Sequence, residues 1–419
     1  MTLAMTAIRL ALLGGALAAG LAAQTGKDSC VACHGALEGS LAEPTAAFQH
    51  DVHKVRGFSC VDCHGGDPTA LDPETSMSRA RGFKGKIDRR AIPELCARCH
   101  SDATLIHRFN PRQRVDQLAQ YRTSVHGRRL AAGDTRVANC VDCHGVHDIR
   151  EVRDPLSPVH PLRLPETCAR CHSDSDHMKG YGIATDQFEK YRRSVHWEAL
   201  SRRGDFSAPS CATCHGNHGA APPGVATVAH VCGSCHAVFE NLFTKSPHKK
   251  AFDELGMPGC VVCHGNHEVA KPTMALVGVQ PGSLCLNCHV EGDKGRQAAE
   301  FMRSRIDELA TVLDGSEEIL KRAERSGMEV SPALVELSGG RESLIRAKVE
   351  LHGFDPVLMD GSVKKGLEIA AAARRAGEKA LQERDFRRKG LLLSLTAIGV
   401  TMAGLWLAVR ELERRSKKG

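Results

Sequence analysis

Apolar residues in this chain of 419 residues form two uncharged runs and one segment with helical periodicity. The longer run, residues 390–409, contains no charged residue, and Lys and Arg flank it on both sides. A run of this length matches the hydrocarbon thickness of a bilayer when it is helical. We therefore predict a transmembrane helix at 390–409 and a basic tail at 410–419. A buried helix of a soluble domain is the alternative.

The shorter apolar run covers residues 10–23 and follows Arg9. This arrangement is typical of a secretory signal, which we place at residues 1–23 with cleavage near Ala22 or Ala23. An uncleaved anchor is the alternative, although the run is short for a membrane span. Export predicts that the chain lies on the periplasmic side of a bacterial inner membrane, held by a single C-terminal anchor with its basic tail in the cytoplasm.

The segment 294–389 is rich in Ala, Leu, Glu and Arg, with apolar residues at helical spacing. We predict a first helix that ends near Gly327, a second that begins at Ser331–Pro332 and is interrupted at Gly339–Gly340, and a third that begins at Asp355–Pro356 and can continue into the membrane. The core positions of the first helix are Phe301, Ile306, Leu309, Leu313 and Leu320. This helical hairpin or three-helix bundle is either a docking surface for a membrane partner or quinol, or a spacer, which we favour.

The cysteines occur as nine copies of Cys-x-x-Cys-His that use all 18 of them. In such a motif the two thiols bind the haem vinyl groups and the His becomes the proximal iron ligand. Zinc ribbons and redox-active pairs share the cysteine spacing but do not require the adjacent His. We therefore predict nine covalently attached c-type haems. The thiols are Cys30, Cys33, Cys60, Cys63, Cys96, Cys99, Cys140, Cys143, Cys168, Cys171, Cys211, Cys214, Cys232, Cys235, Cys260, Cys263, Cys285 and Cys288, and the proximal ligands are His34, His64, His100, His144, His172, His215, His236, His264 and His289.

All nine motifs lie in residues 24–293, which leaves roughly 29 residues per haem, too few for separate folded units. We expect a mostly α-helical domain with extensive irregular loops, in which haems share one core. The polypeptide has a net charge of +7. Nine oxidised haems with ionised propionates bring the sum to roughly −2, so many Lys and Arg are expected to be propionate counter-ions. The charge therefore does not indicate nucleic-acid binding.

The residue after the proximal His alternates from the second motif onward. Gly65, Gly145, Gly216 and Gly265 define a Gly class, and Ser101, Ser173, Ala237 and Val290 define the other class. The domain is therefore predicted to contain four two-haem modules after one extra haem at Cys30.

Further histidines recur at matching places in these modules. Some precede a Gly-class motif, as in Ser-Val-His, and others follow it, as in Cys-His-Gly-x-His. Two more, His107 and His177, follow motifs of the other class. A His three residues beyond a proximal His is too close in the chain to reach the opposite face of the same haem, so we expect it to bind a neighbouring iron. The predicted distal ligands are His53, His107, His126, His147, His177, His196, His218, His248 and His267. His50, His160, His230 and His352 remain as spares, and His352 is interpreted as structural.

The Ser-Val-His segments and sequences such as Cys-His-Gly-Asn-His at 214–218 resemble the multihaem cytochromes of the cytochrome c3-like group with doubled Cys-x-x-Cys-His motifs. The resemblance covers residues 30 to about 290 and implies short loops that carry closely packed bis-His haems and transfer electrons. The first two motifs depart from it, with Leu37 and Asp67 where later Gly-class motifs have His. This leaves the ligation of the first haem open.

The leading functional hypothesis is a membrane-anchored periplasmic electron carrier between a quinol-linked membrane donor and a periplasmic or outer-membrane partner. Because bis-His irons have no vacant position, no catalysis beyond electron exchange is required. One alternative is a multihaem reductase for nitrite, hydroxylamine or a sulfur oxyanion, with an open iron at His34. Another is a quinol dehydrogenase of the NapC and NrfH type, although those proteins carry an N-terminal anchor.

Overall fold

The structure is a computed structural model that describes residues 28–222 and 224–417. The predicted signal at 1–23 lies outside the described residues. Within them every regular element is a helix, which confirms the mostly helical fold with irregular loops. The chain divides into two compact units. Unit 1 extends to Val228 and includes His267–Val269, and unit 2 comprises Ala229–Asn266 and the chain from Ala270 onward.

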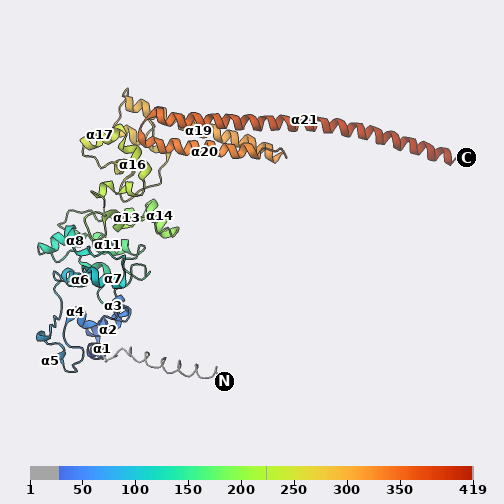
Figure 1. Ribbon diagram of the computed structural model, residues 1–419. Coiled ribbons are helices and arrows are strands. Elements are labelled where there is room, and N and C mark those ends of the chain that lie inside the picture. Colours follow the sequence, from blue (N-terminus) through green and yellow to red (C-terminus); the bar gives the residue numbers. More distant parts are fainter. Residues whose placement is uncertain (1–27, 223, 418–419) are drawn as a thin grey trace, which may run out of the picture. The chain divides into compact units, whose positions relative to one another are not determined.

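Unit 1 consists of short helices joined by loops (Figure 1). Among its described residues few apolar side chains are fully buried. Its elements are α1 Ser29–Gly35, η1 Gly39–Leu41, α2 Glu43–Phe48, α3 Val52–Val55, α4 Cys60–His64, α5 Pro73–Ser76, η2 Arg79–Arg81, α6 Ile92–His100, α7 Ala103–Phe109, α8 Gln117–Thr123, α9 Val125–Ala131, α10 Cys140–His144, α11 Leu164–His172, α12 Ser175–Met178, α13 Gln187–Arg192, α14 Val195–Arg202 and α15 Cys211–His215.

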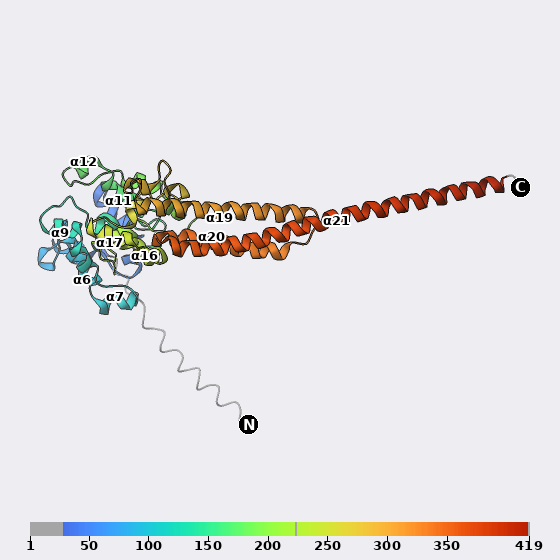
Figure 2. The same ribbon diagram turned by 90° about the horizontal axis from the view of Figure 1, so that it is seen from above.

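Unit 2 combines similar short elements with three long helices. The short ones are α16 Ala237–Thr244, α17 Pro247–Glu254, α18 Cys260–His264, η4 Met274–Leu276, η5 Leu284–Asn287 and η6 Leu351–Gly353, and η3 Val228–Ser234 begins at the boundary between the units. The long ones are α19 Lys294–Arg325, α20 Ser331–Glu350 and α21 Pro356–Ser416. The helices α19 and α20 lie beside the first part of α21, which continues beyond them (Figures 1 and 2).

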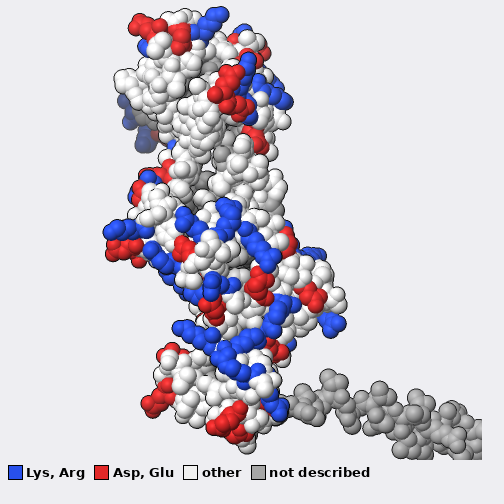
Figure 3. Space-filling view, turned by 90° about the vertical axis from the view of Figure 1, so that its left-hand side faces the viewer, with Lys and Arg blue, Asp and Glu red and all other residues white. Residues whose placement is uncertain are grey.

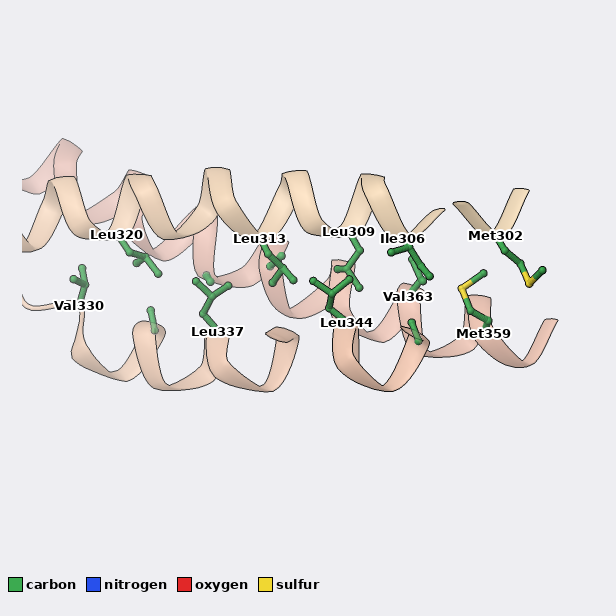
Figure 4. Close-up of a cluster of buried hydrophobic side chains, with 14 of the residues drawn as sticks. Met302, Ile306, Leu309, Leu313, Leu320, Val330, Leu337, Leu344, Met359 and Val363 are labelled. Atoms are coloured by element: carbon green, nitrogen blue, oxygen red, sulfur yellow. The ribbon is translucent and has the colours of Figure 1, made fainter. Parts of the chain in front are cut away.

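The bundle of α19, α20 and α21 has a continuous apolar core, drawn in Figure 4. Ile306, Leu309, Leu313 and Leu320 project from α19 at intervals of three, four and seven residues, which place them on one helix face, and each is fully buried. Burying such a side chain contributes about 1.5–3 kcal/mol. The predicted three-helix bundle is therefore present in the structure, and its core follows the predicted apolar positions except for Phe301, which is 40% exposed.

The predicted interruption at Gly339–Gly340 is absent, because α20 runs through both glycines. The Gly340 backbone packs closely on a neighbouring helix, since a Cβ atom there would lie 2.6 Å from Leu313 Cδ2. Gly366 of α21 makes a similar approach to Leu309. These glycines act as small residues at helix contacts, and the packing outweighs their low helix propensity.

The last part of α21 contains the predicted membrane span. Residues 390–409 are exposed throughout, and α21 has an 18-residue window with a mean hydropathy of 2.0. Exposure of so many apolar side chains is unfavourable in water and is accommodated by lipid. This helix is therefore a candidate membrane anchor.

Candidate haem sites

Three motif helices of unit 1, α4, α10 and α15, are single turns that begin with a cap and are followed by a glycine. Before α10, the Asn139 N–H donates to Asp142 Oδ2 (2.7 Å) while the Asn139 side chain caps the first turn. Ser59 with Asp62 and Ser210 with Thr213 form the same reciprocal box before α4 and α15. Such caps satisfy the N–H groups that a first turn leaves free. Each motif therefore presents its two Cys and its His from a defined turn.

The thiols of successive motifs lie close together in each unit. In unit 1 burial raises the pKa of Cys63, and the neighbouring Cys96 and Cys99 thiols raise it further. The thiol of Cys96 is also hydrogen-bonded to that of Cys140. The same relation recurs at Cys168 and Cys211, where the neighbouring Cys211 thiol, together with burial, raises the pKa of Cys168. Consecutive motifs along the chain are therefore consecutive in space.

In unit 2 the last three motifs follow the same order. The Cys260 thiol is hydrogen-bonded to that of Cys232. Burial raises the pKa of Cys263, and Cys285 and Cys288 are among the nearby thiols that raise it further. The motif order is thus preserved inside both units.

Arginines link the two motifs of a module in unit 1. Arg98 Nη2 donates to the Asp62 carbonyl (3.1 Å), and Arg170 Nη2 donates to the Asp142 carbonyl (2.8 Å). Arg89 adds a two-pronged contact to the Asp142 carboxylate, at 3.1 and 2.7 Å. Lys and Arg are interspersed with Asp and Glu on the face drawn in Figure 3. Many of these cations therefore have local carboxylate or carbonyl partners.

The histidines that precede Gly-class motifs lie in the first turn of short helices with buried caps. Ser124 Oγ accepts from the Gly127 N–H (3.0 Å) and donates to the Tyr121 carbonyl (2.7 Å), which positions His126 on α9. The Tyr121 hydroxyl in turn donates to the Ala138 carbonyl (2.8 Å), just before the next motif. Tyr191 makes the matching bond to the Pro209 carbonyl (2.7 Å). The repeated Tyr and Ser side chains thus connect the helices of His126 and His196 to the motif that follows.

His53 is held by a buried carboxylate. Asp51 is 1% exposed and accepts from the His53 N–H (2.8 Å), from His53 Nδ1 (2.9 Å) and from the Ile149 N–H (2.8 Å). Burial alone would raise the pKa of Asp51, but these hydrogen bonds outweigh it and hold the pKa below its ordinary value. A carboxylate on Nδ1 orients a histidine ring and leaves Nε2 free for a metal.

In unit 1 the structure brings proximal and spare histidine rings together in pairs. Their centroids lie 5.8–6.1 Å apart. The pairs are His53 with His100, His64 with His147, His126 with His172, His144 with His218, and His215 with His267. Pairs at Gly-class motifs are nearly parallel, with interplanar angles of 23°, 7° and 12°. The other two are steeply inclined, at 89° and 61°.

Unit 2 contains two further pairs. His248 lies 5.9 Å from His289 at 86°, and His264 lies 6.1 Å from His352 at 15°. The second pair was missed by the sequence interpretation, which treated His352 as structural. The signal available in the sequence was weak, because His352 stands outside every repeated segment.

These pairs fit a metal ion between two imidazoles. With metal–nitrogen distances of about 2 Å on each side, two opposed imidazole rings have centroids about 6 Å apart. Burial lowers the pKa of His126, His172 and His264, and it lowers the pKa of His144 to about 4. Neutral imidazole is the form that binds metal. In addition, the Nδ1 atom of His248 is buried without a hydrogen-bond partner. The donor set therefore suits a haem iron.

Other predicted ligands lie elsewhere. His107 is exposed, and its Nε2 donates to the Gln113 carbonyl (3.1 Å). His177 stacks on Tyr181 at 6.5 Å and accepts at its carbonyl from Arg136. The structure does not place either ring against a proximal His in the described part of the chain. His196 stays a predicted ligand, which the described contacts do not test.

The first motif differs from the others. His34 Nδ1 lies 3.2 Å from the Leu41 carbonyl. Among the described residues no second histidine ring lies against it, and His50 is exposed.

Residues 46–152, which contain the motifs at Cys60, Cys96 and Cys140, match the family model described as cytochrome c7 and related cytochrome c. Neither the curated proteins nor the solved structures contain a match. The matched stretch covers both motif classes, and the same capped turns and ring pairs recur beyond it. The similarity implies covalently bound c-type haem and redox protein partners. Over residues 46–152 the chain is thus similar to the multihaem electron-transfer cytochromes c.

Proposed function

We propose that this protein is a membrane-anchored periplasmic cytochrome that carries electrons along nine c-type haems, between a quinol-linked membrane donor and a periplasmic or outer-membrane partner. The observation that carries the proposal is the spatial order of the motifs. In each unit the thiols of consecutive motifs are neighbours, so haems attached to them would follow one another in a row.

The histidine pairs support a role in electron transfer rather than in substrate binding. We assign the distal positions in unit 1 to His53, His126, His147, His218 and His267, and one in unit 2 to His248. Two imidazoles occupy both axial positions and leave no site for an exogenous ligand. When bound, haem supplies one-electron oxidation and reduction of its iron at a potential that these ligands hold low.

The bundle separates the haem sites of unit 2 from the candidate membrane span. His352 precedes α21, and residues 356–390 of that helix extend about 50 Å at 1.5 Å per residue. Arg384 Nη1 donates to Ser326 Oγ (3.4 Å), so the far end of the bundle lies about two turns before residue 390. Tunnelling rates fall exponentially with distance. This spacing favours a stalk under the haem sites and argues against direct oxidation of membrane quinol, as in the NapC and NrfH type.

A second candidate function, a reductase, is favoured by one observation at the first motif. Because no second ring lies against His34 in the described part of the chain, an iron held there would have a position for nitrite, hydroxylamine or a sulfur oxyanion. Reduction of such a ligand needs an open iron face.

Electron paramagnetic resonance of the oxidised full-length protein tests these functions, after haem has been quantified as the pyridine haemochrome. We expect nine haems per chain. Low-spin signals that do not change on addition of cyanide or nitrite support a pure carrier. One high-spin haem that shifts on addition of either ligand, and that is altered in His34→Ala, supports the reductase. Fewer than six low-spin haems in a fully loaded chain would contradict the six distal ligands assigned above.

A further inference from the structure

The turn between α20 and α21 places two aromatic side chains against the haem sites of unit 2. In this turn, η6 is followed by Phe354, which has a φ of 49°, in the left-handed region that a bulky residue rarely adopts. His352 lies 6.1 Å from His264, and Phe354 lies 3.9 Å from His248. His248 in turn faces His289. The turn therefore reaches both of the last two sites in the chain.

The His352 ring is prepared to bind through its outer nitrogen. Its Nδ1 donates to the Val349 carbonyl (3.0 Å), which leaves the Nε2 lone pair available. Phe239 packs on the ring at 4.7 Å and restricts its rotation. These contacts are those expected of an oriented metal ligand rather than of a surface histidine.

The pattern of the other Gly-class sites shows which place His352 fills. His64 faces His147, His144 faces His218, and His215 faces His267. In each case the second ring comes from the Cys-His-Gly-x-His segment of the next module. His264 belongs to the last module, and no later segment of this kind exists in the chain. His352 faces it at 15°, in the same nearly parallel arrangement.

We propose that His352, supplied by the helical bundle, is the distal iron ligand of the haem attached at Cys260 and Cys263. This inference rests on the proposed function, since it requires haem at that motif. It adds that the bundle is part of the electron-transfer unit and is joined to its haems through an axial ligand. A bundle detached from this turn would leave that iron five-coordinate.

The test compares His352→Ala with His50→Ala, a variant of an exposed histidine outside the predicted ligand set, in the full-length protein. Both should keep nine haems by pyridine haemochrome. In His352→Ala we expect one haem equivalent to change from low-spin to high-spin, to bind cyanide, and to return to low-spin when imidazole is added. His50→Ala should have the wild-type spectrum. A low-spin spectrum of His352→Ala identical to wild type would overturn the assignment.

A second variant covers the case in which His352→Ala does not accumulate. In His352→Met we expect the iron to stay six-coordinate and one haem to titrate at a higher potential than in wild type, because Met ligation raises the potential. An unshifted redox titration would also contradict the ligand role. The proposed function and the His352 assignment fail in different ways. If the wild-type protein held no covalent haem, the proposed function would be wrong, whatever the variants show.

Discussion

At the scale of single residues, the alternation after the proximal His has a backbone cause. Gly65, Gly145, Gly216 and Gly265 all have positive φ, between 69° and 86°. Ser101 and Ser173 have φ values of −102° and −104°, which side chains adopt freely. The glycine ends the motif helix and turns the chain toward the segment that holds the next histidine. The two classes therefore differ in chain direction after an otherwise similar turn.

Gly65→Ala should destabilise unit 1 more than Gly182→Ala does. Both glycines have a φ of 69°, where Ala costs roughly 1–2 kcal/mol. The Cβ atom at Gly182 meets nothing within 4 Å, whereas at Gly65 it would lie 2.1 Å from the Gly82 carbonyl oxygen. We expect the free energy of unfolding to fall by about 1 kcal/mol in Gly182→Ala and by about 3 kcal/mol or more in Gly65→Ala. Urea unfolding measures this difference, and the midpoint should be lower in Gly65→Ala. Equal midpoints would mean that the close backbone contact carries no cost.

At the scale of elements, the chain uses two kinds of helix. The motif helices are too short to be stable alone, so caps, arginine clamps and attached porphyrins must hold them. The bundle helices are long and amphipathic and pack through Leu, Ile and Ala with small residues between them. Ser316 shows how close this packing is, because its buried hydroxyl donates to the Ala370 carbonyl of α21 (3.0 Å).

Adjacent glycines of α20 should respond in opposite directions to alanine. Gly339→Ala adds a Cβ atom at an ordinary 3.6 Å from Ile369 Cδ1, so the gain in helix propensity should stabilise the bundle by about 0.5–1 kcal/mol. Gly340→Ala places its Cβ atom 2.6 Å from Cδ2 of Leu313, which is fully buried. That crowding should cost about 1–3 kcal/mol.

Thermal unfolding followed by circular dichroism at 222 nm measures both variants. Gly315→Ala is the matched control in α19, since its Cβ atom meets nothing within 4 Å and only propensity changes. If Gly340→Ala were as stable as Gly315→Ala, the result would contradict the close contact between α20 and α19 at Gly340.

At the scale of the whole molecule, a haem-binding part without a conventional core is combined with a helical bundle that has one. The last three motifs belong to the same compact unit as the bundle, whereas the sequence placed a domain boundary after residue 293. The predicted boundaries at 24–293, 294–389 and 390–409 stay a prediction. The last motifs group with the bundle because of the η6 turn. Its His352 ring lies against Phe239 of α16 and against His264 of α18.

A chain that ends after Lys389 should leave the membrane fraction and keep its haems. The truncation removes the exposed apolar residues 390–409 but no residue of the bundle core. Ultracentrifugation of cell membranes, followed by haem staining of pellet and supernatant, measures the distribution. A chain that ends after Ser416 is the control and should remain in the pellet. If the shorter chain also sedimented with membranes, residues 390–409 would not be the principal anchor.

Much of this organisation could be predicted from the sequence, because it depends on short-range features. The haem motifs, the two classes, the three helices and the apolar run at 390–409 are each set by neighbours within a few turns. The two motif classes differ in the backbone of the residue after the proximal His, which is a glycine with positive φ in the Gly class. Six of the predicted spare histidines, among them His53 and His147, also lie against proximal rings in the structure.

The partner of each ring depends on the path of the chain between distant segments and could not be predicted in the same way. His147 crosses to His64 rather than to a nearer motif, and His352 reaches His264 from the bundle. His107 also follows a haem motif closely in the sequence, but its ring faces the Gln113 carbonyl and no proximal ring in the described part of the chain. Ring pairing requires loop closure and packing between segments far apart in the sequence, and local propensity carries no information about either.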